Sequence, residues 1–238
     1  MSYFPQLQKD FNTAMQGAQQ SPAVTRILSA TLRPAHYQEM LRQIYFQVRE
    51  NPQIQACATA YFRGHQRTQV GSFLKHATQE VGHDQLALND LAAMHIDTTD
   101  LPARNPLPAT AAVTAFAYYQ IQHLNPVGYL GYLFFLEFMP TGHGAVYVQA
   151  FKHAGVPDGA FSFIQEHVTV DVAHNRLMER YVRELVVTDA DYQCVRYAMQ
   201  TTAKLYSRMI EDAFAEADLH LESGPGSCEP TRLAPLVV

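Results

Sequence analysis

Apolar residues recur with the spacing of a helix along almost the whole chain. Near the start, Phe4, Leu7, Phe11 and Met15 follow one another at intervals of three or four residues within 2–19. That spacing places them on one helical face. We see no sustained apolar–polar alternation of the kind that strands show, with turns every ten residues or so. The pattern therefore predicts an all-α protein.

Proline, glycine and asparagine divide this pattern into predicted helices. We expect a bundle of about eight helices, several of them over twenty residues long, in a single domain over 1–221. A turn-rich tail should follow over 222–238. Pro34 should end the second helix, which begins after Ser21-Pro22, and the turn at Pro140–Gly144 should end another. The main helices are predicted over 2–19, 35–49, 54–62, 68–95, 110–123, 126–138, 145–153, 161–180 and 190–219.

Composition narrows the classes of function. Of 238 residues, 47% are hydrophobic and 16% are charged, which is enough to build a large core. The net charge of -5 argues against a nucleic-acid partner. The three cysteines, Cys57, Cys194 and Cys228, have no CxxC spacing and suit a reducing cytoplasm. The start of the chain does not resemble a signal peptide, and Val127–Leu136 is too short to span a bilayer, so we expect a soluble cytoplasmic protein without a membrane partner.

The predicted helix over 161–180 carries His167, Asp171 and His174 at spacings of four and three. At 100° per residue, these side chains fall within about 60° of one helical face. Imidazole and carboxylate groups on one stripe are typical ligands of a divalent metal. The same pattern alone also fits a solvated helix face.

The pattern occurs a second time, as His76, Glu80 and His83 in the predicted helix over 68–95. Two copies on helices with nearby apolar residues favour a metal site over a solvated surface. Glu137 supports this interpretation, because its neighbours one turn back are Leu133 and Phe134. A lone carboxylate on so apolar a helix needs protonation, a basic partner or a metal, unless it only caps the helix end before Pro140.

Seven side chains are too many for one ion and suit two metals that share bridging carboxylates. Oxygen and imidazole donors indicate Fe, with Mn as the alternative. His76 is the least certain member, since it could instead support a ligand from behind. The predicted ligands are Glu80, His83, Glu137, His167, Asp171, His174 and His76, and no catalytic residue is predicted beyond them. The other histidines lack an acid and a second histidine at helical spacing, which indicates capping, surface or core roles.

These residues resemble the haem-oxygenase-like diiron oxidase and oxygenase superfamily. The resemblance covers roughly 20–220 and rests on Glu80-x2-His83, on Gly131-x5-Glu137 and, most specifically, on His167-x3-Asp171-x2-His174. It implies a helical bundle with two irons that uses O2 as co-substrate. Such an enzyme would oxidise a small metabolite that carries an amine or a carboxylate. Where the family commonly has a further carboxylate one turn before Glu80 or in an earlier helix, this chain has His76.

Neighbours in the same fold group give the alternatives. A TenA/THI-4 (thiaminase II) enzyme would need a nucleophilic cysteine, and neither Cys57 nor Cys194 has an evident base beside it. Haem oxygenase would need one proximal histidine, for which His36 is the candidate. A cofactorless enzyme like the pyrroloquinoline-quinone-synthesis oxidase would leave the pairing of histidines and acids unexplained. In a non-catalytic member of the fold, the histidine-rich faces would be a vestigial site or a dimer surface.

The substrate site is the least specified part of this prediction. We expect Phe134, Phe138 and Tyr45 to line the substrate cavity. A cation could anchor an acidic substrate, and the sequence does not choose among Arg42, Lys75, Lys152 and Arg176. We also expect a homodimer.

Overall fold

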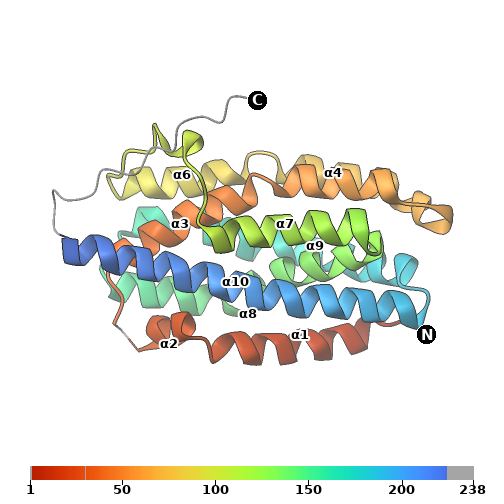
Figure 1. Ribbon diagram of the computed structural model, residues 1–238. Helices are drawn as coiled ribbons and strands as arrows, with labels where there is room; N and C mark the ends of the chain where they lie inside the picture. Colours follow the sequence, from red (N-terminus) through yellow and green to blue (C-terminus); the bar gives the residue numbers. More distant parts are fainter. Residues whose placement is uncertain (1, 30, 224–238) are drawn as a thin grey trace.

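The computed structural model describes residues 2–29 and 31–223, without the side chains of Thr141 and of residues 169–174. Its described part contains ten α-helices and four short 3-10 helices, and no strand. The all-α prediction is confirmed, with more α-helices than the eight expected. The helices, drawn in Figure 1, are α1 (Phe4–Gln19), α2 (Pro22–Leu28), α3 (Pro34–Val48), α4 (Asn51–Tyr61), α5 (Val70–Glu80), α6 (His83–Ala93), α7 (Pro108–His123), α8 (Tyr129–His153), α9 (Ser162–Leu185) and α10 (Asp189–Ser223).

The long helices lie side by side and share one elongated core (Figure 1). Helix α8 packs against α9 and α10, while α3 packs against α10 and α6. Helix α1 covers α10 from one side, and α4 contacts α5 and α7. The helix of 35 residues, α10, thereby runs along most of the bundle. The apolar stripe of α1 faces inward as predicted, since Leu7, Phe11 and Met15 are buried.

The segment predicted as one helix over 68–95 is three elements. A 3-10 turn over Gly64–Gln69 leads into α5, which ends at Glu80, and α6 begins at His83. Gly82 between them has a φ of 95°, in the left-handed region that favours glycine. Glu80 and His83 therefore belong to two different helices, and the helical-face argument does not hold for this pair.

Two prolines behave differently from the prediction. Pro34 begins α3, where the missing N–H of a first-turn proline costs nothing. Pro140 lies inside α8, which continues to His153. Proline cannot donate to the carbonyl of Leu136, one turn earlier. Because α8 packs along both α9 and α10, we attribute its continuation to tertiary contacts that outweigh this local loss.

Gly131 sets the distance between α8 and α10. A Cβ built at this position would lie 2.1 Å from the Val195 carbonyl oxygen and 2.5 Å from the Met199 nitrogen. Both atoms belong to the backbone of α10, so neither can move aside alone. The two helices therefore meet backbone to backbone at this point.

Helix α10 is the last helix of the described residues. Helix α10 extends to Ser223, two residues past the expected domain limit, and 224–238 of the predicted tail lie outside the described residues. Cys57 and Cys194 are free thiols. Within the described ranges, no helix combines the length and the apolar character needed to cross a membrane.

Candidate metal centre

Five of the seven predicted ligands come together from four helices. His76 and Glu80 lie on α5, His83 on α6, Glu137 on α8 and His167 on α9. His76, Glu80 and Glu137 are buried, whereas His83 and His167 are half-buried. Asp171 and His174 lie on the backbone of α9, and their side chains are outside the described residues.

The first group consists of His76, Glu80 and Glu137. Nε2 of His76 lies 3.2 Å from Oε1 of Glu137 and 3.7 Å from Oε1 of Glu80. One potential ligand atom from each residue lies within 4.8 Å of the other two. Such convergence suits a small cation held between α5 and α8.

The second group consists of Glu80, His83 and His167, again with potential ligand atoms within 4.8 Å of one another. Nδ1 of His83 lies 3.3 Å from Oε2 of Glu80, and the rings of His83 and His167 have centroids 5.0 Å apart. Glu80 is common to both groups and presents one oxygen to His76 and the other to His83. A carboxylate in this position can bridge two metals.

His167 is oriented by its own helix. Its Nδ1 donates to the carbonyl of Phe163 at 2.7 Å, which leaves the lone pair on Nε2 for a metal. Burial lowers the pKa of His167, and the neighbouring His83 lowers it further. A lowered pKa keeps the imidazole neutral, which is the form that binds metals.

Asp90 on α6 fixes the start of α9. Its carboxylate accepts from the Ser162 nitrogen at 2.8 Å, from the Ser162 hydroxyl at 2.6 Å and from the Phe163 nitrogen at 2.9 Å. These bonds satisfy the first N–H groups of a helix that has no cap of its own, since Phe161 makes no side-chain cap bond. Asp90 therefore ties the helix that carries His83 to the helix that carries His167.

The donor set fits iron. Three imidazoles and two carboxylates meet where water is largely excluded, and buried carboxylates need compensating positive charge. Mixed nitrogen and oxygen donors suit Fe or Mn, whereas structural zinc sites are built mainly from cysteine ligands. The residues that would hold the metal are thus present in the described part of the chain.

A comparison with protein families supports this conclusion. The sequence profile described as "Iron-containing redox enzyme" matches residues 38–207, which include all seven predicted ligands. The chain belongs to this family. A search of curated proteins gave no match.

Solved structures show that this member of the iron-containing redox enzyme family has the haem-oxygenase-like fold. A domain of unknown function with a heme oxygenase-like fold from Shewanella denitrificans OS217 has a TM-score of 0.87 at 24% identity, covering 95% of this chain and 98% of that one. A TenA homologue from P. horikoshii OT3 has a TM-score of 0.73 at 12% identity, with coverage of 90% and 99%. A TenA homologue from Pseudomonas syringae pv. tomato DC3000 has a TM-score of 0.71 at 15% identity, covering 89% of this chain and 92% of that one. The predicted superfamily is confirmed.

Two buried tyrosines near the candidate ligands, Tyr129 and Tyr181, were not predicted from the sequence. Burial raises the pKa of Tyr129 well above its ordinary value, and the charges of Glu80 and Glu137 contribute. Burial also raises the pKa of Tyr181, whose ring centroid lies 6.3 Å from that of His76. Both hydroxyls lack a hydrogen-bond partner among the described residues. Only the place of Tyr129 two turns before Glu137 on one helix could have indicated its proximity.

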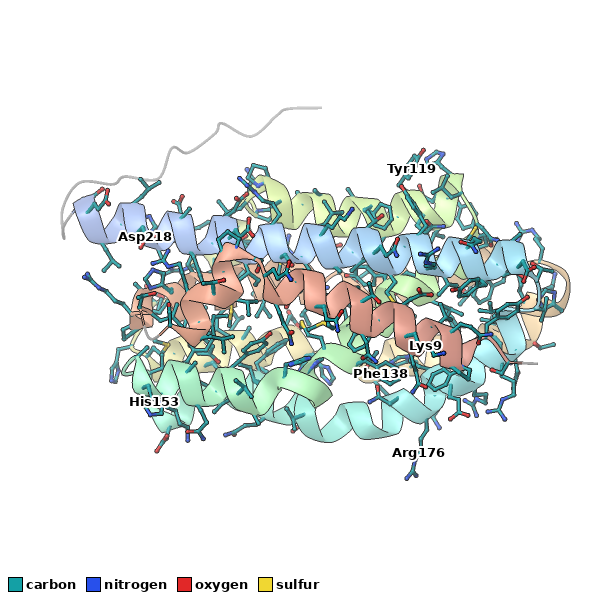
Figure 2. All side chains as sticks on the ribbon, turned by 90° about the horizontal axis from the view of Figure 1, so that it is seen from below. Lys9, Tyr119, Phe138, His153, Arg176 and Asp218 are labelled. Carbon is teal, nitrogen blue, oxygen red and sulfur yellow. The ribbon has the colours of Figure 1, made fainter. Side chains whose placement is uncertain are left out.

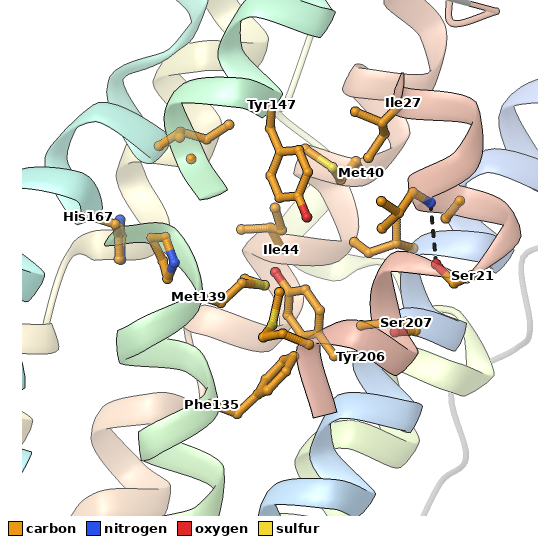
Figure 3. A pocket seen from close by; sticks show the side chains of 18 of the residues that line it. Ser21, Ile27, Met40, Ile44, Phe135, Met139, Tyr147, His167, Tyr206 and Ser207 are labelled. Atoms are coloured by element: carbon orange, nitrogen blue, oxygen red, sulfur yellow. Dashed lines mark hydrogen bonds between the residues drawn. The ribbon is translucent and has the colours of Figure 1, made fainter. Parts of the chain in front are cut away.

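An apolar cavity of about 90 Å³ lies next to His167, one of the candidate metal ligands (Figure 3). His167 lies on its wall, with Met139, Ile44 and Tyr206 beyond it. None of the three predicted substrate residues lines this cavity. Phe134 and Phe138 stack at 4.4 Å in an aromatic cluster beneath α1, and Tyr45 packs on Phe46. Their role toward a substrate stays a prediction that this cavity does not support.

The candidate cations do not line the cavity either. Arg42 pairs with Glu39 at 2.7 Å, and Lys152 pairs with Asp158 at 2.8 Å. Figure 2 shows Arg176 pointing away from the bundle. Among the histidines not predicted as ligands, His36 caps α3 and pairs with Asp218, in agreement with a structural role.

Proposed function

We propose that the protein is a diiron oxidase or oxygenase that uses O2 to oxidise a small molecule with an amine or carboxylate group. The observation that carries this proposal is the shared carboxylate of Glu80. Its two oxygens face two ligand groups, which a single-metal site would not need. Membership in the iron-containing redox family supports iron over manganese.

The chain would hold one metal with His76, Glu80 and Glu137 and the other with Glu80, His83 and His167. Asp171 and His174 would complete the shells from α9, as the superfamily resemblance implies. When bound, the two irons supply the electrons that reduce O2. The protein supplies a neutral imidazole at His167, oriented by the Phe163 carbonyl.

The surroundings would control water and protons. The ring of Phe163 lies 4.2 Å from that of His167, and both side chains line the same apolar cavity. The raised pKa values of Tyr129 and Tyr181 keep both phenols protonated at neutral pH. Each phenol can then donate a hydrogen bond toward Glu137 while it stays neutral in its buried position.

The TenA-like reading is the second candidate, because two TenA homologues share the fold over about nine tenths of this chain. Neither Cys57 nor Cys194 lines the cavity beside His167. Burial raises the pKa of Cys194, which makes its thiol a weaker nucleophile. The TenA-like alternative therefore has the fold in its favour but no cysteine among the described residues that line this cavity.

The decisive measurement is metal stoichiometry under anaerobic conditions. The metal-free protein is titrated with Fe(II), bound iron is counted, and O2 consumption is followed after air is admitted. We expect about two irons per chain and O2 uptake that depends on them. His83→Ala should lower both. A parallel titration with Mn(II) tests the choice of metal.

His153→Ala is the matched control. This exposed histidine lies at the end of α8, where Nδ1 bonds to the carbonyl of Gln149 in its own helix (Figure 2). It should bind iron like the wild type. One iron per chain at saturation, or equal loss in both variants, would contradict the dimetal proposal.

A further inference from the structure

The apolar cavity beside His167 lies between α1, α2, α3, α8, α9 and α10. By the same measure of volume, one water needs about 10–15 Å³. The cavity's volume of about 90 Å³ is several times larger. It therefore has room for part of a small organic molecule.

The wall of the cavity is almost free of charge. No Asp, Glu, Lys or Arg occurs among the described residues that line it. Ile44 and Met139 lie in its middle, together with the uncharged phenols of Tyr147 and Tyr206 (Figure 3). A charged group in this middle part would lose its hydration without gaining a partner of opposite charge.

Polar groups mark the two ends of the cavity instead. Figure 3 shows His167 on one side and Ser21 with Ser207 on the other, with Ile44 between them. Ser21, Ser207 and Ala18 also line an adjoining, more polar groove between α1 and α10. Ala18 thus stands at the passage from the groove into the cavity.

We propose that this cavity binds an alkyl or arylalkyl chain whose single amine or carboxylate group lies at the His167 end. The inference rests on the proposed function and narrows its substrate class. A second charge part-way along the chain is excluded, because no described side chain of opposite charge lines the cavity there. Molecules with such a second charge, for example short diamines and ω-amino acids, are therefore not substrates of this site.

The test measures binding by calorimetry with straight-chain amines and carboxylates of four to eight carbons. Burial of a methylene group predicts about fourfold tighter binding for each added carbon, within one head-group series. The better head group shows whether an amine or a carboxylate is recognised. A four-carbon ω-amino acid, whose second charge lies at the far end of its chain, should bind at least about tenfold more weakly than the amine or carboxylate of the same length.

Ala18→Phe and Ala14→Phe form the matched pair for this test. Ala14 lies one turn earlier on α1 and lines only the outer groove. Ala18→Phe should weaken binding of the longest chain by at least about tenfold and flatten the dependence on chain length. Ala14→Phe should bind like the wild type. Ala18→Leu, a smaller change, repeats the measurement should the phenylalanine disturb folding.

Three outcomes would overturn the inference: affinity independent of chain length, equal losses in the two alanine variants, or tighter binding of the amino acid. The titrations are run on metal-free and on Fe(II)-loaded protein. Chain-length dependence without iron binding would contradict the proposed function while leaving the apolar site in place. Normal iron binding without chain-length dependence would contradict the apolar substrate site and leave the proposed function in place.

Discussion

At the scale of single residues, Glu80 has the position with the most consequences. It is buried at the end of α5, and its two oxygens face His76 and His83 respectively. His76 belongs to only one of the two ligand groups, the one that it forms with Glu80 and Glu137. The two residues can therefore be told apart by how many metals each one affects.

Glu80→Ala should weaken both metal positions, whereas His76→Ala should weaken one. Because outer partners of metal ligands already contribute about 10–100-fold in affinity, loss of a ligand should cost at least about 100-fold at each affected position. Fe(II) titration against a chelator of known affinity measures both steps. Two unchanged binding steps in His76→Ala would show that His76 is not a metal ligand, and a loss of only about 10–100-fold at one step would show that it supports a ligand from behind.

At the scale of elements, the joint between α5 and α6 shows what a sequence pattern can and cannot predict. The spacing of His76, Glu80 and His83 correctly indicated that these side chains lie close together. It gave the wrong local geometry, because Val81-Gly82 interrupts the helix. The same spacing in sequence fits three side chains on one helix face and three side chains that meet where two helices join. Only the tertiary structure distinguishes these two arrangements.

Gly82→Ala should destabilise the protein, since its φ of 95° is unfavourable for any residue with a Cβ. The expected loss in the free energy of unfolding is about 1–2 kcal/mol, measured by urea denaturation of the metal-free protein. Gly71→Ala is the control. Gly71 has open space around its Cβ position and lies in the first turn of α5, so alanine should be neutral or stabilise by up to about 1 kcal/mol. Equal stability of Gly82→Ala and the wild type would contradict the strain argument.

At the scale of the whole molecule, an ion-pair cluster ties α2 and α3 to the far end of α10. Asp218 accepts from Arg26 at 2.6 Å and pairs with Nε2 of His36 at 2.9 Å. The hydrogen bonds, first from Arg26 and then from His36, lower the pKa of Asp218 from 3.8 to about 2. Asp218 is partly exposed, so solvent screens the cluster and its contribution to stability is modest.

The sign of the pH dependence follows from this lowered pKa. The stabilisation by Asp218 is complete above the unfolded value of 3.8 and is lost as the pH falls toward about 2. Asp218→Asn should therefore be less stable than the wild type by about 0.5 kcal/mol near pH 5. Urea denaturation at decreasing pH should show this difference shrinking below about pH 4. A difference that stays constant down to pH 3 would show that Asp218 does not titrate in this way.

The fold class followed from the sequence because amphipathic spacing survives in the folded chain. The five candidate ligands that lie together could be picked out because imidazoles and acids at ligand spacing are rare in apolar helices. The cavity could not be predicted from the sequence, because lining residues such as Met40, Met139 and Tyr206 are far apart in the chain and belong to no recognisable motif. The continuation of α8 through Pro140 also escaped prediction, because packing against α9 and α10 has no local signature.

The backbone contact at Gly131 also bears on how this sequence can vary over evolutionary time. Leu130 and Leu133 on the same helix can be exchanged for other apolar residues of similar volume at small cost. Gly131 has no such freedom, because even a methyl group would collide with the main chain of α10. Glu137 lies less than two turns further along α8. We therefore expect lineages that keep the carboxylate to keep the glycine as well, so that drift along this helix is limited by the width of the bundle as much as by its chemistry.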